Sequence, residues 1–374
     1  SVAALFSDTR EFSEQVASHA ALMEDLSGKR PRVFENTEFA FSTEVAALVR
    51  GMGFSALYSE GYDHLLSVGH PNALYSCGGL PVLLRNCRLS DDLAFRFFDP
   101  GWDRYPLSAG TFADWIAATP GDCIHVFIDA RTFSPARSVH ADFRGFFAAL
   151  PDALRSRGIE TLLPSDCLRE PARGEIPPGD LCVCKPGTIA SPTGIQNILQ
   201  QSAFWCLEEG GRLVARDREA WRRLQATDHF HRMALCSASC GRQVPHSTNE
   251  ETCDYFAAYM RVLEYLELSS APRFRSRSAL RALRCLPPER AFHFHTGTRY
   301  AGYSAHSLSE FARILEFVPA HVYSFHHGRG DFSRWVGDVL GDKTLSRALA
   351  GCRTAAEARE TVQARIGELW RRLG

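Results

Sequence analysis

Residues 55–60 read Ser-Ala-Leu-Tyr-Ser-Glu, a short apolar run that ends in the carboxylate of Glu60. Residues 123–129 read Cys-Ile-His-Val-Phe-Ile-Asp, which is apolar almost throughout and also ends in a carboxylate, that of Asp129. Short, nearly continuous apolar runs are typical of strands that are buried on both faces of a parallel sheet. Both runs therefore predict strands, each with an acidic residue at its carboxyl end.

Helical patterns alternate with runs of this kind through the first 175 residues. The predicted strands lie at residues 32–38, 55–60, 81–85, 123–129 and 160–164, and the predicted helices at residues 11–23, 43–52, 108–117 and 143–157. Such alternation predicts an α/β fold with a parallel sheet covered by helices. In these sheets the active-site residues usually lie at the carboxyl ends of the strands, so the pattern favours a barrel-like hydrolase.

The sequence pattern changes after residue 170. Residues 170–187 and 269–278 are rich in Pro, Gly or Arg and predict linkers. Helical patterns fill residues 195–268, whereas residues 291–295 and 322–326 alternate like strands around a helix at 307–317, with further helices at 332–340 and 355–373. We therefore predict three domains, an α/β domain over 1–175, a helical region over 186–268 and a small α+β domain over 287–374.

The composition excludes several classes of protein. Charged residues make up 23% and hydrophobic residues 45% of the 374 residues, with a net charge of -1, so neither disorder nor a basic surface for nucleic acid or membrane is indicated. No apolar run approaches the roughly 18 residues that cross a membrane. The 12 cysteines are irregularly spaced. We expect a reduced cytoplasmic protein with no cofactor and no metal, and the oligomeric state stays open.

Two carboxylates at the ends of strands are the minimum apparatus for hydrolysing a glycosidic bond. One acts as nucleophile, and the other protonates the leaving oxygen and then activates water. Glu60 and Asp129 are the best candidates for this pair. On spacing alone, helix caps or solvated loop charges explain these carboxylates better.

Longer motifs point to one family. They lie at residues 32–38, 53–66, 83–97 and 221–230, and they resemble the α-amylase-type branch of glycoside hydrolase family 57. The resemblance implies a (β/α)7 barrel and a retaining enzyme that acts on α-glucans, as an amylase or a 4-α-glucanotransferase. Glu60, in Ser59-Glu60-Gly61, matches the nucleophile, and Asp129 matches the acid/base. The candidate substrate-binding residues in the matched motifs are Glu38, Asp63, His64, Arg88, Asp91, Asp228 and His229.

The chain also departs from the family pattern. Arg131 stands where the family's acid/base motif has Glu, and Ser134 stands where it has Gly. A cation beside Asp129 would favour the ionised carboxylate, whereas a general acid must hold its proton. The motifs of the family's first strands do not occur, so we predict a barrel that is incomplete at its N-terminus. Residues 290–295 and 329–342 resemble a small uncharacterised module attached to such amylase homologues.

Two alternatives stay open. The first is a catalytically impaired homologue that binds glucan or a protein partner, with sugar rings stacked on aromatic side chains such as those of Tyr58, Tyr62, Trp102, Tyr105 and Trp205. The second is a metal-dependent deacetylase that uses Asp63, His64 and His70, although these residues lack the spacing of that class. Five histidines of the last domain also suggest a metal, but packing explains them better: His293, His295, His306, His326 and His327.

Overall fold

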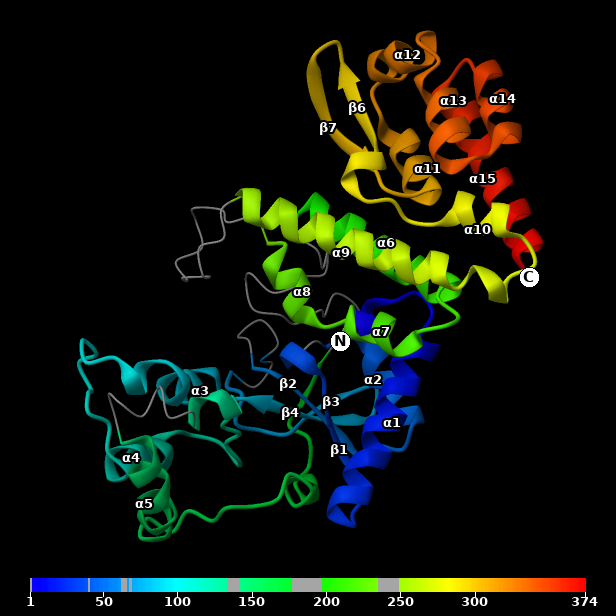
Figure 1. The fold of residues 1–374 in the computed structure, drawn as a ribbon. Coiled ribbons are helices and arrows are strands. Elements are labelled where there is room, and N and C mark those ends of the chain that lie inside the picture. Colours follow the sequence, from blue (N-terminus) through cyan, green and yellow to red (C-terminus); the bar gives the residue numbers. More distant parts are fainter. Residues whose placement is uncertain are drawn as a thin grey trace. The chain divides into compact units, whose positions relative to one another are not determined.

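The computed structural model describes residues 2–39, 41–61, 66, 69–133, 142–176, 197–234 and 249–374. The chain forms two compact units, one over Ser7–Gly194 and the other over Ser1–Phe6 together with Ile195–Gly374. Figure 1 shows the elements of each unit. The division into three domains stays a prediction.

The sheet of the first unit confirms the predicted α/β class. Its strands are β1 (Val33–Glu35), β2 (Ala56–Glu60), β3 (Tyr75–Cys77), β4 (Leu80–Arg85) and β5 (Gly174–Glu175), in the order β1-β2-β4-β3-β5. β1, β2 and β4 run parallel, whereas β3 is antiparallel to β4. Among the described residues the sheet is open, so the structure does not show a (β/α)7 barrel.

The antiparallel strand arises from a tight turn. Only Gly78 and Gly79 separate β3 from β4, with φ angles of 54° and 77°. A two-residue hairpin whose twist suits the strands requires positive φ at both positions, and glycine adopts that conformation most easily. This glycine pair therefore reverses the chain beside the parallel strands.

Two predicted strands are wrong. Within 123–129 only His125 bridges to Arg85, because β4 ends at Arg85 and the chain then turns into α3 (Cys87–Ala94). Ile124, Val126 and Ile128 instead pack against an apolar cluster centred on Phe97, Phe112 and Phe143. Residues 160–164 form no strand either, since no described strand lies against them and the side chains of Leu162 and Leu163 are exposed.

The predicted helices of this unit are confirmed. They are α1 (Arg10–Ser27), α2 (Thr43–Gly51), α4 (Ala109–Ala118) and α5 (Phe143–Arg155). Polar side chains begin most of them: Ser42, Ser108 and Asp142 each accept a hydrogen bond from a backbone N–H of the first turn. Such a cap contributes about 1 kcal/mol to a helix.

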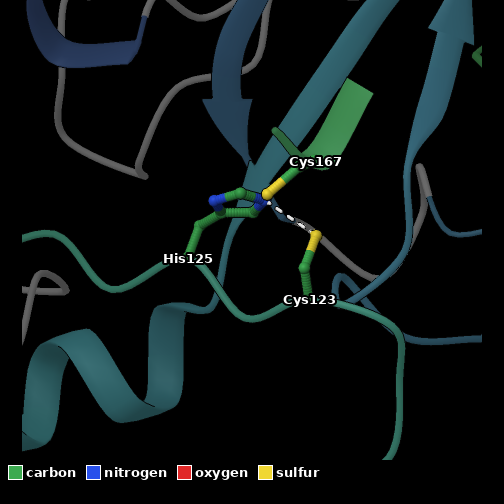
Figure 2. Close-up of side chains that lie close together, drawn as sticks. All are labelled: Cys123, His125 and Cys167. Atoms are coloured by element: carbon green, nitrogen blue, oxygen red, sulfur yellow. Dashed lines mark hydrogen bonds between the residues drawn. The ribbon is translucent and has the colours of Figure 1, made fainter. Parts of the chain in front are cut away.

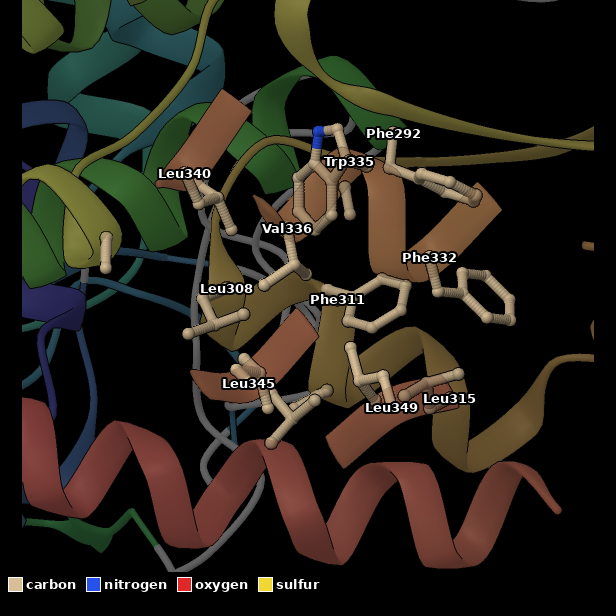
Figure 3. Close-up of a cluster of buried hydrophobic side chains, with 14 of the residues drawn as sticks. Phe292, Leu308, Phe311, Leu315, Phe332, Trp335, Val336, Leu340, Leu345 and Leu349 are labelled. Atoms are coloured by element: carbon tan, nitrogen blue, oxygen red, sulfur yellow. The ribbon is translucent and has the colours of Figure 1, made fainter. Parts of the chain in front are cut away.

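The second unit is mostly helical. It contains α6 (Ile198–Leu213), α7 (Arg218–Arg223), α8 (Thr227–Arg232), α9 (Asn249–Ser269), α10 (Arg277–Leu283), the antiparallel pair β6 (Phe292–Thr296) and β7 (Arg299–Ala305), α11 (Leu308–Phe317), α12 (Ala320–Gly328), α13 (Asp331–Trp335), α14 (Lys343–Gly351) and α15 (Ala355–Leu373). A π-helical turn, Val336–Leu340, follows α13. Figure 3 shows part of the apolar core of the second unit, where Phe311, Phe332 and Trp335 pack together.

One strand prediction in this unit is wrong. Residues 322–326 lie in α12, not in a strand. Val322, Tyr323 and His326 are its buried residues, which is the spacing of one helix face rather than of a strand. The strand predicted at 291–295 is confirmed as β6.

Candidate functional site

Glu60 lies at the carboxyl end of β2, opposite Arg85 in the register of β2 and β4. The Arg85 guanidinium donates to the Glu60 carboxylate through Nη1, and its Nη2 lies 2.6 Å from Asp91 Oδ1. The side chains of Arg85 and Glu60 are only 4% and 2% exposed. Burial lowers the pKa of Arg85, but the two carboxylates outweigh this effect and raise it overall. Arg85 and Glu60 therefore form a buried ion pair, in which each charge compensates the other.

Cys87 is the second donor to the Glu60 carboxylate. Its Sγ donates to Glu60 Oε1 at 3.0 Å from the first turn of α3. Burial, together with the hydrogen bond and the negative charge of Glu60, raises the pKa of the Cys87 thiol to about 12. The thiol is therefore protonated at neutral pH and acts as a donor.

Gly61, the last residue of the Ser59-Glu60-Gly61 motif, has a steric reason to be glycine. A Cβ at this position would lie 2.5 Å from the backbone oxygen of Arg85 and 2.6 Å from Cβ of Pro71. Neither neighbour is the end of a flexible side chain, so any larger residue would push β2 and β4 apart. The glycine thus lets Glu60 and Arg85 stay in contact.

A cavity of about 740 Å³ lies beside this cluster. Gly61 and Cys87 form one part of its wall, and Arg88 and the rings of Trp102 and Trp115 form others. The two tryptophan rings meet edge to face, with centroids 5.9 Å apart. Glu60 itself is not among the lining residues, because the Cys87 side chain and Gly61 lie at that edge of the cavity. The volume falls in the range of small-ligand sites.

Asp129 lies at the end of the segment that passes β4 at His125. Its side chain is exposed, and its backbone oxygen accepts a hydrogen bond from Thr132 N at 2.8 Å, at the start of the 3₁₀ helix Ala130–Phe133. Phe127, two residues earlier, packs on Tyr58 of β2, with ring centroids 4.6 Å apart. The segment that carries Asp129 thus runs close to the strand that carries Glu60.

The other predicted binding residues fall into three groups. Asp91 contacts Arg85, and Arg88 lines the cavity. Glu38 belongs to the 3₁₀ helix Thr37–Phe39, and Asp63 and His64 lie outside the described residues, as does Tyr62. Asp228 and His229 lie in α8 of the other unit, where His229 Nδ1 is 2.6 Å from the Tyr255 hydroxyl and burial lowers the His229 pKa. Their roles stay predictions.

The histidines of the last domain contact protein groups. His293 Nδ1 lies 2.7 Å from Ser304 Oγ, His306 Nδ1 lies 3.0 Å from the backbone oxygen of Leu286, and His326 Nδ1 lies 2.9 Å from Asp331 Oδ2. These contacts agree with a packing role.

Sequence reasoning missed two features. It did not single out Arg85, although an arginine that ends a strand beside a predicted catalytic strand was a usable signal. It also missed a convergence of Cys123, His125 and Cys167, whose donor atoms lie within 4.8 Å of one another. Cys167 is distant in sequence from the other two, so only the fold shows this cluster.

The structure also bears on membrane association in one respect. Among the described helices, none combines the length and the apolarity that crossing a bilayer would take. The cytoplasmic location stays a prediction.

The fold and the matched motifs agree with comparisons to known proteins. Residues 1–182 match the model of glycosyl hydrolase family 57. A protein of Methanocaldococcus jannaschii named "Putative alpha-amylase" is 30% identical over 238 residues, which are 62% of this chain and 51% of that relative. The chain therefore spans about half the length of the relative.

Proposed function

We propose that this chain acts on α-glucans as a retaining glycoside hydrolase, of amylase or 4-α-glucanotransferase type, with Glu60 as nucleophile and Asp129 as acid/base. One observation carries the proposal: Arg85 stabilises the Glu60 carboxylate at the carboxyl end of a parallel strand, inside the segment that matches the family. A nucleophilic carboxylate must be ionised, and an adjacent buried guanidinium favours that state.

The chemistry takes two steps. Glu60 attacks the anomeric carbon while Asp129 gives its proton to the leaving glycosidic oxygen, which yields a covalent glycosyl ester. Asp129 then removes a proton from water, or from a sugar hydroxyl, and that oxygen displaces Glu60. A retaining pair needs its carboxyl groups about 5–5.5 Å apart in the reacting complex. Water as acceptor gives hydrolysis, and a sugar as acceptor gives transglycosylation.

The cavity beside Glu60 is where the proposed substrate binds. Trp102 and Trp115 offer ring faces for sugars, and Arg88 offers hydrogen-bond donors for hydroxyl groups. Glu60 Oε1 accepts a hydrogen bond from the thiol of Cys87, and Cys87 lines this cavity. Attack through Oε1 on a sugar bound there requires that Cys87 release this oxygen and turn aside.

A specific observation favours the second candidate, a homologue that binds glucan without turnover. The Glu60 side chain is 2% exposed and lines no part of the cavity. Arg131 and Ser134, which depart from the family's acid/base motif, favour the same candidate. In that case the cavity would bind the glucan, and the Arg85–Glu60 pair would serve stability.

Amylose distinguishes the two candidates. We would measure reducing-sugar release and chain-length redistribution for the unmodified chain, for Glu60→Gln and for Glu35→Gln, a matched control at the end of β1. A catalytic Glu60 predicts that turnover falls on the order of 10³-fold or more in Glu60→Gln and stays unchanged in Glu35→Gln. Circular dichroism would check that each variant is folded.

Two outcomes would count against catalysis. One is a folded, unmodified chain that binds amylose but releases no reducing ends and redistributes no chains. The other is equal turnover in Glu60→Gln and the unmodified chain. In the favourable case, azide added to Glu60→Ala would restore turnover and give a glycosyl azide of inverted configuration, because azide would replace the missing nucleophile.

A further inference from the structure

Three soft or borderline ligand atoms converge on one face of the sheet, away from the Glu60 cluster. Figure 2 shows Cys123 and His125 from the segment beside β4, with Cys167 facing them from the 3₁₀ helix Cys167–Arg169. Cys123 Sγ lies 3.3 Å from His125 Nε2, and the three donor atoms all lie within 4.8 Å of one another. Because the chain is extended here, residues two apart face the same side.

The surroundings of the cluster are apolar. Cys123 and Cys167 pack with Ala56, Leu74 and Leu83 in one hydrophobic cluster. The His125 side chain is also buried, at 9% exposure. His125 Nδ1 faces the Tyr58 hydroxyl at 3.5 Å, while Nε2 faces the sulfur atoms. Tyr58 is thus placed as the outer partner that orients a ligating imidazole.

We propose that Cys123, His125 and Cys167 bind one Zn²⁺ ion. Two thiolates and an imidazole are ligands that this cation prefers over oxygen-seeking cations such as Ca²⁺ or Mg²⁺. Two thiolates also balance the charge of the ion, so the occupied site is neutral in its apolar setting. The proposal is independent of the function proposed for Glu60.

The distances agree with tetrahedral zinc. Bonds of about 2.3 Å to sulfur and about 2.0 Å to nitrogen place tetrahedral ligand atoms roughly 3.5–3.8 Å apart. The 3.3 Å between Cys123 Sγ and His125 Nε2 and the 4.8 Å limit for the whole set differ from these values by about an ångström or less. Side-chain rotation alone covers such a difference.

The fourth position faces a cavity. A cavity of about 680 Å³ is lined by Tyr58 and by all three proposed ligands. Three protein ligands with a fourth position open to solvent or ligand are typical of zinc sites that are not purely structural. We therefore assign the fourth position to water or to a small ligand that enters from this cavity.

The test begins with the unmodified, reduced chain. After dialysis against Zn²⁺, elemental analysis would count bound metal, and X-ray absorption at the zinc edge would identify the ligand atoms. We expect one ion held by two sulfur atoms, one imidazole nitrogen and one further light atom. A chain that retains no zinc, or an ion with four sulfur ligands or none, would overturn the proposal.

Variants then assign the ligands. Co²⁺ in place of Zn²⁺ gives a thiolate charge-transfer band, which should weaken in Cys123→Ser and in Cys167→Ser and should be lost when both cysteines are replaced. Cys253→Ser, at an exposed cysteine of α9, is the matched control and should keep both the band and the metal. Should a ligand variant fail to fold, the absorption spectrum of the unmodified chain still decides.

The same two thiols suggest one competing outcome. Cys123 and Cys167 are close enough that oxidation would join them. Mass spectrometry of the chain, purified without reductant, would detect a Cys123–Cys167 disulfide. If that bond forms and the reduced chain does not take up zinc, the cluster is a thiol pair and the metal proposal is wrong.

Discussion

Arg85 and Glu60 form an ion pair that is buried on both sides, across the parallel strands β4 and β2. Asp91, at 2.6 Å from the other guanidinium nitrogen, completes a cluster of one cation and two carboxylates. In the apolar interior each charge depends on its partner, since desolvation of a lone charge costs several kcal/mol. The candidate nucleophile is therefore also part of the structural core.

Replacing Arg85 should destabilise the first unit strongly. Arg85→Met leaves the Glu60 carboxylate buried without its cation, and the expected loss is about 3–5 kcal/mol in the free energy of unfolding. Arg155→Met is the matched control in α5, because Arg155 and its partner Asp152 are 75% and 81% exposed, and it should cost about 0–1 kcal/mol. Urea unfolding measures both, and similar losses for the two variants would contradict this account.

Cys87 should resist alkylation. Its raised pKa, about 12, leaves roughly 10⁻⁴ of the thiol as thiolate at pH 8, and the thiolate is the reactive form. We expect Cys87 to react with iodoacetamide far more slowly than the exposed Cys253, as read by peptide mass spectrometry. Glu60→Gln should speed the reaction at Cys87, because it removes the negative charge that opposes ionisation. Unchanged labelling in that variant would show that burial alone protects the thiol.

Trp102 should contribute to binding of glucan in the 740 Å³ cavity. Trp102→Ala is expected to weaken binding of a maltooligosaccharide about tenfold, or roughly 1.4 kcal/mol of aromatic contact. Trp205→Ala is a suitable control, since Trp205 lies in the second unit and Arg313 stacks over its ring at 4.5 Å. Calorimetric titration measures both. Equal affinity for Trp102→Ala and the unmodified chain would exclude this cavity as the sugar site.

Glu267 should make the stability of the second unit depend on pH. Its carboxyl group accepts a hydrogen bond from Cys285 N at 2.7 Å, but burial dominates and raises its pKa from 4.5 to about 8. Between these two values the folded chain binds more protons than the unfolded chain. The contribution of Glu267 is therefore fully present below pH 4.5 and is lost as the pH rises through 8.

The variant Glu267→Gln isolates this contribution. All other titrating groups are common to Glu267→Gln and the unmodified chain, so their effects cancel in the difference between the two unfolding free energies. This difference should change by up to about 1.4 kcal/mol for each pH unit from 5 to 8. As the pH rises, the change favours the variant. Urea unfolding at several pH values measures it. Glu316→Gln, at an exposed partner of Arg359, is the control. Parallel stability curves for Glu267→Gln and the unmodified chain would contradict the predicted shift.

Much of the fold followed from local patterns. Ser42, Ser108 and Asp142 begin helices that periodicity places within a few residues, and β2 and β4 lie where continuous apolar runs predict them. Residues 123–129 failed as a strand because apolarity measures burial and not pairing. Ile124, Val126 and Ile128 are partly buried against helices, while one residue alone meets a strand.

In the candidate site, too, some features were predictable from the sequence and others depended on the fold. The Ser59-Glu60-Gly61 motif singled out Glu60 as the candidate nucleophile, and longer motifs carried the family resemblance, since motif matching needs only the order of residues along the chain. The partners of Glu60 depended on register: Arg85 lies opposite Glu60, and Cys87 follows at the start of α3.

By itself, the sequence predicted the α/β class, and it gave the resemblance to glycoside hydrolase family 57 that singles out Glu60 as a candidate nucleophile. The tertiary structure decided that Glu60 is buried against Arg85, and that Cys123 and His125 meet Cys167. The reason is physical: helices and strands follow from contacts a few residues apart, whereas ion pairs and metal ligands depend on which distant segments the packed sheet brings within a few ångströms.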